Sequence, residues 1–115
     1  MPVINNRQPQ YAEHVEGGDG RMLRDRLLEG SQLGGVCTYA AQISLEPGCS
    51  IGYHQHSGDS EMYFLTEGEA TYTENDVEYQ VKKGDVLYCE DGSFHGIANT
   101  GAGMLSFVAI IQKSA

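Results

Sequence analysis

GCSIGYHQHSGDSEMYFLTEG, residues 48–68, is the stretch that decides the fold, because short β-type segments alternate in it with glycine-containing turns. His54 and His56 are separated by one residue, and on a strand that spacing places both imidazoles on the same face. Glu61 follows after a four-residue loop, which can fold its carboxylate back beside them. The stretch therefore predicts two imidazoles and a carboxylate gathered on one side of a β structure.

Outward from this stretch, turn signals divide the chain into short segments that read as strands. Strands are expected over residues 21–28, 36–46, 61–66, 70–73, 77–81, 86–89, 94–98 and 104–111. The segment 21–28 also contains residues that favour helices, but eight residues between glycines is short for a helix. Asn75-Asp76 predicts a hairpin, whereas residues 1–20 predict an arm with little regular structure. So many short strands indicate an all-β sandwich or barrel.

Composition narrows the classes of function. The 115 residues suit one domain, and 7 basic against 16 acidic residues give a net charge of −9. This charge argues against binding to nucleic acid or to an anionic membrane, since both require clustered Lys and Arg. The three cysteines, Cys37, Cys49 and Cys89, are odd in number and far apart, which favours reduced thiols. With no signal-peptide or membrane-spanning pattern, we expect a cytoplasmic protein.

A third imidazole completes a candidate metal site. His95 lies about 40 residues after His54 and His56, and it would have to converge on them from across a barrel. Three neutral imidazoles and one carboxylate suit Mn(II), Fe(II), Co(II), Ni(II), Cu(II) or Zn(II), and an octahedral ion would keep two positions open. Two histidines separated by one residue are by themselves more often exposed or hydrogen-bonded, so the prediction depends on the joint pattern.

The joint pattern resembles the two motifs of the cupin superfamily. The first stretch has the spacing Gly48-x5-His54-x-His56-x4-Glu61-x6-Gly68, and the second has Gly84-x5-Glu90-x-Gly92-x2-His95-x3-Asn99. Together they cover residues 48–99, and they agree in glycines, candidate ligands and asparagine. Glu90 departs from the pattern, because the family usually has Pro there. Pro would stiffen the turn, so the loop before His95 gains freedom, while Asp91 and Gly92 still favour a turn.

The resemblance implies a double-stranded β-helix, that is, a cupin or jelly-roll barrel of six to eight strands. Residues 34–115 would form the barrel domain, and residues 1–33 an N-terminal arm and edge strand, which two chains of a homodimer could exchange. One divalent metal ion per chain would be bound by His54, His56, Glu61 and His95, with Mn or Fe ahead of Zn, Ni, Co or Cu. Asn99 would be a structural residue.

Two functions remain open at this stage. The first is a metalloenzyme of the decarboxylase, dioxygenase or isomerase type that acts on a small chelating acid, diol or phenol. The alternative is a non-catalytic protein that binds a small molecule through its metal. A barrel without metal is the least supported hypothesis, because the whole ligand set is present.

Residues around the metal are harder to assign from sequence. If Glu61 points into the barrel, alternation points Tyr63 inward too, so Tyr63 is the candidate catalytic residue, with core packing as an equal alternative. Arg21, Arg24 and Arg26 could contact a substrate carboxylate only if their strand reaches the pocket. His14 is expected at the surface.

Overall fold

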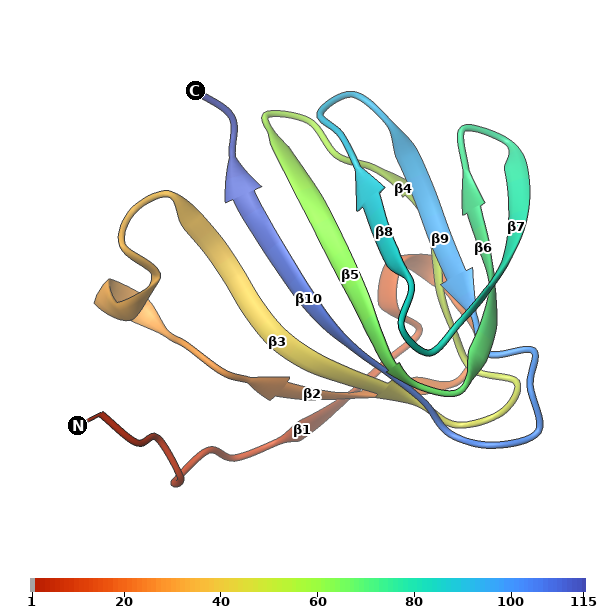
Figure 1. Cartoon of the computed structure of the whole chain (residues 1–115), viewed down its shortest axis with the longest axis horizontal. Coiled ribbons are helices and arrows are strands. Elements are labelled where there is room, and N and C mark those ends of the chain that lie inside the picture. Colours follow the sequence, from red (N-terminus) through yellow and green to blue (C-terminus); the bar gives the residue numbers. More distant parts are fainter. Residues whose placement is uncertain (1) are drawn as a thin grey trace.

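Two antiparallel sheets make up the computed structural model, which describes residues 2–115 (Figure 1). The six-stranded sheet has the order β1 (Gln10–Glu13), β2 (Arg21–Arg26), β3 (Cys37–Leu45), β10 (Leu105–Lys113), β5 (Asp59–Glu67) and β8 (Val86–Cys89). The four-stranded sheet has the order β4 (Ser50–Gln55), β9 (Phe94–Ala98), β6 (Glu69–Glu74) and β7 (Val77–Lys82). From β3 onward the chain passes repeatedly from one sheet to the other. This arrangement confirms the predicted all-β double-stranded β-helix.

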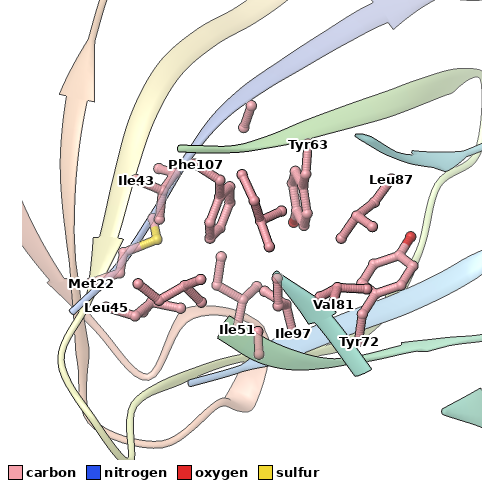
Figure 2. Packing of buried hydrophobic residues seen from close by; sticks show 14 of the residues in the cluster. Met22, Ile43, Leu45, Ile51, Tyr63, Tyr72, Val81, Leu87, Ile97 and Phe107 are labelled. Atoms are coloured by element: carbon pink, nitrogen blue, oxygen red, sulfur yellow. The ribbon is translucent and has the colours of Figure 1, made fainter. Parts of the chain in front are cut away.

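The core lies between the two sheets, because each strand turns alternate side chains inward. Leu65 and Phe107 on the larger sheet are fully buried, and so is Ile97 on the smaller one. Figure 2 shows the two sets of side chains meeting. Ile43, Tyr63, Leu87 and Phe107 come from the larger sheet, while Ile51, Tyr72, Val81 and Ile97 come from the smaller one. The inward placement of Tyr63 follows the predicted alternation.

The β6–β7 hairpin turns at the predicted residues. Asn75 and Asp76 have φ values of 47° and 69°, as a type I′ turn requires, and Asn is favoured there. The Asn75 side chain accepts a hydrogen bond from the backbone N–H of Phe94 over 3.0 Å. The hairpin is thereby attached to β9, the strand that carries His95.

The N-terminal arm is more ordered than its sequence indicates. The strand predicted at residues 21–28 is present as β2, and Met22 is buried in the core. The expectation of little regular structure before it was wrong for residues 10–17, which form β1 and the 3-10 turn η1 (Val15–Gly17). The short polar segment becomes a strand because β2 offers it a free edge, a tertiary effect with no local signal. A second 3-10 turn, η2 (Gly30–Leu33), was also not predicted.

The turn η1 packs directly on β4 through a contact between two stretches of backbone. A Cβ atom on Gly52 would collide with the carbonyl oxygen of Glu16, and one on Gly18 would collide with that of Ser50. His14 and Glu16 have φ values of 50° and 53°, an uncommon conformation for residues with side chains. Glycines at positions 18 and 52 are therefore needed for η1 to lie against the strand that carries His54.

Two further expectations can be compared with the structure. Cys37, Cys49 and Cys89 all have free thiols, in agreement with the prediction of no disulfide framework. Within residues 2–115, neither helical turn has the length and apolar character needed to cross a membrane.

We expect Gly52→Ala to lower the free energy of unfolding by about 1–3 kcal/mol, because the added methyl must push η1 away from β4. Chemical denaturation of the purified variant measures this change. Gly103→Ala is the matched control, since no atom lies near a Cβ there and φ is not in the left-handed region. Equal losses in the two variants would contradict the backbone contact.

Candidate metal centre

Four side chains from distant parts of the chain converge at the mouth of the barrel. His54 lies near the end of β4, His56 just after it, Glu61 in β5 and His95 in β9. One potential ligand atom of each lies within 4.8 Å of those of the other three. The Nε2 atoms of His56 and His95 are 3.0 Å apart, and they lie 3.0 and 3.1 Å from Oε1 of Glu61. The structure thus brings together all four residues predicted as ligands, in a group that could hold a metal ion.

Strand pairing explains this convergence. His54 is directly opposite His95 in the β4–β9 ladder, beyond a register shift after Ile51. Two backbone hydrogen bonds then keep the chain beside the turn that precedes β9: His56 N–H donates to the Ser93 carbonyl, and Gly92 N–H donates to the His56 carbonyl. Antiparallel pairing therefore compensates for the 39 residues that separate His56 and His95.

In His54 and His56, the ring nitrogen Nδ1 has a hydrogen-bond acceptor. Nδ1 of His54 lies 2.7 Å from the Gly52 carbonyl oxygen, and Nδ1 of His56 lies 2.8 Å from the Asp59 carboxylate. Since these oxygens only accept, each Nδ1 must carry the hydrogen. In a neutral imidazole the Nε2 lone pair is then free, and for His56 that atom points at the centre. This is the tautomer that a metal ligand requires.

His95 is oriented by a chain of two further side chains. The Tyr72 hydroxyl donates to the Glu74 carboxylate over 2.7 Å and lies 3.0 Å from Nδ1 of His95. Because its single hydrogen is used on Glu74, the Tyr72 oxygen must accept from Nδ1 of His95. The ring of Tyr63 also stacks on His95, with centroids 5.1 Å apart. Both contacts direct the Nε2 atom of His95 toward the centre.

Contacts among His56, Glu61 and His95 determine which of these side chains are charged. The hydrogen bond with Glu61 raises the pKa of His56 to about 9, in spite of the opposing effect of burial. Burial alone would raise the pKa of Glu61, but the hydrogen bond from His56 and the contact with His95, 3.1 Å away, outweigh this and lower it. For His95, burial dominates and lowers the pKa. In the absence of metal, the stable arrangement is therefore a carboxylate paired with one imidazolium.

This pairing predicts a pH dependence of stability in chelator-treated protein. Because the pKa of His56 in the fold, about 9, exceeds its ordinary value of 6.5, the contact stabilises the fold fully below pH 6.5. The stabilisation is lost as pH rises through about 9. We expect the thermal midpoint of wild type to fall across this range relative to that of His56→Gln. Parallel curves for the two proteins would contradict the His56–Glu61 pair.

A cavity of about 400 Å³ opens beside three of the four side chains, His54, His56 and Glu61, and its volume is within the size range of small-molecule sites. His54, His56, Glu61 and Tyr63 line it, together with Asp59 of the intervening loop. The six-stranded sheet adds Arg24 and Tyr39, and η1 adds Val15 and Glu16. Arg24 donates from Nε to the Tyr39 hydroxyl over 2.7 Å. The cavity therefore has a candidate metal group at one place and a guanidinium at another.

The structure shows which of the other residues singled out in the sequence line the cavity. Among the three arginines of β2, Arg24 alone lines this cavity; Arg21 pairs with Glu46 over 3.6 Å, and Arg26 lies beside a different hollow. Tyr63 lines it too, although its side chain is only 3% exposed. Asn99 has the implied structural role, because its side chain donates to two backbone carbonyls.

Sequence reasoning missed several residues around the candidate ligands. Asp59 and Tyr72 contact candidate ligands, Glu74 accepts a hydrogen bond from Tyr72, and Glu16 lines the cavity. A signal existed only for Asp59, which lies three residues after His56 in a loop already predicted to fold back. The others reach the site through pairing or packing of segments that their own sequence does not link to it.

Comparison with known proteins agrees with the geometry. The family model described as the cupin domain matches residues 41–111. The oxalate-binding protein of Thermotoga maritima is 33% identical over 103 residues, which cover 90% of this chain and 85% of that protein.

Solved structures give the same result. A predicted oxalate decarboxylase from Thermotoga maritima superposes with a TM-score of 0.94 at 31% identity, covering 97% of this chain and 99% of that one. The plu4264 protein of Photorhabdus luminescens, at 19% identity, shows the likeness in fold alone, with a TM-score of 0.77 over 99% of this chain and 90% of that one. On the evidence of its fold, its two motifs and these matches, the chain belongs to the cupin family.

Proposed function

We propose that this protein binds one divalent transition-metal ion through His54, His56, Glu61 and His95, and binds a small chelating carboxylate at that ion. The donor set supports the first part, because imidazoles and one carboxylate suit Mn(II) and Fe(II), with Zn, Ni, Co and Cu as further candidates. The hydrogen bonds on the outer nitrogens of the three imidazoles support it too, since they free Nε2 for a metal.

Arg24 is the observation that carries the second part. Its Nε–H is used by Tyr39, and within residues 2–115 its guanidinium forms no ion pair, so its terminal nitrogens still have donors to offer. A guanidinium and a divalent metal in one cavity suit an anion with two oxygen-bearing ends. One end would bind the metal and the other would contact Arg24.

The relatives support a choice among such anions. One is an oxalate-binding protein and another is a predicted oxalate decarboxylase. We therefore propose oxalate, or another small dicarboxylate, as the ligand of this chain. Its two adjacent carboxylates would provide oxygens both for the metal and for Arg24.

Turnover of this ligand is the second candidate function. A metalloenzyme of the decarboxylase, dioxygenase or isomerase type would act on a small acid, diol or phenol in the same cavity. Tyr63 favours this candidate, because it lines the cavity beside Glu61. Burial, reinforced by the Glu61 charge, raises its pKa well above 10, so the hydroxyl stays protonated and can donate a hydrogen bond. Product analysis with Mn(II)- or Fe(II)-loaded protein separates an enzyme from a binding protein.

Two further predictions from the sequence stay part of this proposal. A homodimer suits a small cupin, and residues 1–33 could contribute to it as an exchanged arm while residues 34–115 form the barrel. The single-chain structure supports a structural role for this arm, since β2 pairs along β3 and adds Met22 to the core. A cytoplasmic location is proposed from the free thiols and the sequence pattern.

Tyr72→Phe tests the metal site through a residue that is not itself a ligand. Loss of the acceptor at Nδ1 leaves His95 free to adopt the wrong tautomer or orientation, so we expect Mn(II) affinity to fall about tenfold or more. Titration calorimetry with Mn(II) measures it. Tyr79→Phe, at an exposed position of β7, is the control and should bind as wild type does. A wild-type protein that binds none of the six candidate metals would overturn the proposed function.

Arg24→Gln tests the anion contact. The metal-loaded variant should bind oxalate at least about tenfold more weakly, because a charge-assisted pair is replaced by a neutral amide, while its Mn(II) affinity stays unchanged. Arg26→Gln is the matched control, two residues along β2 and outside the cavity. Equal oxalate affinities for the two variants would exclude Arg24 as the anchor.

A further inference from the structure

The cavity beside the candidate metal group is larger than oxalate requires. Its volume is about 400 Å³, a size at which protein pockets enclose ligands well above oxalate, the smallest dicarboxylate. Two carboxylates, one at the metal ion and one at Arg24, would therefore leave part of the cavity unfilled. The residues that line this remaining part indicate what else the ligand carries.

Strand register identifies the wall between the two polar ends of the cavity. Ile111 on β10 pairs with Glu61 on one side and with Tyr39 on the other, and all three residues line the cavity. Since neighbouring strands lie about 4.8 Å apart, the backbones of Glu61 and Tyr39 are separated by roughly 10 Å. Ala109, the next inward-facing residue of β10, also lines the cavity. An aliphatic surface therefore lies between the metal group and the Arg24–Tyr39 pair.

A second aliphatic surface lines the cavity from the side of the smaller sheet. It is formed by Val15 of η1 and Ile51 of β4, and η1 packs on β4 through the close backbone contact at Gly52. Val15 and Ile111 are both only half-buried, so each of them presents apolar surface to the cavity. Water in contact with these two side chains would be released by an apolar group placed between them, and this release favours binding.

The charged side chains of the lining limit what this group can be. Glu16 lies next to Val15, and Asp59 lies between His56 and Glu61, so both add negative charge to the lining. Within residues 2–115, Arg24 is the one Arg or Lys that lines the cavity. A third anionic group on the ligand would be repelled, and a cationic group would lose its hydration against Val15. The part of the ligand beyond the two carboxylates should therefore be uncharged and apolar.

We propose that the ligand of this cavity is a small dicarboxylate with an aliphatic or aromatic side group, which packs between Ile111 and Val15. This inference rests on the function proposed above and adds a selectivity to it. The carboxylates contact the metal ion and Arg24, as in that proposal. Oxalate then binds as the minimal ligand, and a dicarboxylate with an apolar branch binds more tightly.

Malonate and isobutylmalonate test this selectivity, because they have the same two carboxylates and differ only in the alkyl branch. Titration calorimetry with Mn(II)-loaded wild type should give an affinity for isobutylmalonate at least about tenfold higher, since each buried methylene contributes about fourfold. The ratio of the two affinities is the quantity to compare among variants. A change in metal occupancy or in the fold affects both ligands alike and leaves this ratio unaltered.

Ile111→Ala should lower the ratio to about threefold or less, because much of the apolar surface against the branch is removed. Ile110→Ala is the matched control. It changes the same residue type at the next position of β10, which lines a different hollow, and it should keep the wild-type ratio. Val15→Ala makes the same test from the η1 side, and it replaces Ile111→Ala if that variant does not fold.

Two results would overturn the selectivity alone. One is a wild-type protein that binds malonate at least as tightly as isobutylmalonate. The other is a wild-type ratio that persists in both Ile111→Ala and Val15→Ala. If Mn(II)-loaded wild type binds neither malonate nor isobutylmalonate nor oxalate, the proposed function fails and this inference fails with it.

Discussion

The buried carboxylate of Glu61 is the constraint on which the site depends. Its side chain is 5% exposed, and a charge removed from water in this way destabilises a fold by several kcal/mol unless opposite charge and hydrogen bonds compensate. His56 supplies both as an imidazolium, with its Nε2 atom 3.0 Å from Oε1 of Glu61. A divalent metal ion would supply more, since it would interact with the carboxylate and with every Nε2 lone pair at once. The same cluster is therefore a balanced ion pair without metal, and it could serve as a ligand set for a metal ion.

The barrel can satisfy this constraint because surrounding residues hold the three imidazoles in place. They do so through hydrogen bonds to the Nδ1 atoms, which face away from the centre. Asp59 and the Gly52 carbonyl accept the Nδ1 hydrogens of His56 and His54, and Tyr72, which itself donates to Glu74, accepts that of His95. These acceptors come from three strands, β4, β5 and β6. The geometry of the centre thus depends on correct register in two sheets, and a slip of one residue would turn these side chains to the opposite face.

The sequence was sufficient to identify the four residues that come together, because these residues have chemistry that is recognisable at fixed spacing. Three imidazoles, one carboxylate and the glycines of two turns identified both the barrel and the four residues that meet in it. The residues around the four candidate ligands could not be predicted from the sequence, and the reason is physical. Tyr72 and Arg24 have ordinary strand positions, and only the pairing of β6 with β9 and of β2 with β3 brings them near the site. Pairing between distant strands is a property of the whole sheet, not of any local window. The same applies to β1, whose polar sequence forms a strand because an unpaired edge lies next to it.

The residues of the site come from two parts of the chain: those that hold the candidate metal group and those that line the rest of the cavity. The match to the cupin domain covers residues 41–111, which contain the whole candidate metal group. Arg24, Tyr39, Val15 and Glu16 line the same cavity from outside that range. The close contact between η1 and Gly52 joins the two parts, and the Gly52 carbonyl also orients His54. If the cavity binds an anion as proposed, substitutions in the N-terminal segment would change which anion fits while the candidate metal group stays intact. Changes at residue 52 affect both, because they act on the segment and on the ligand through the same residue.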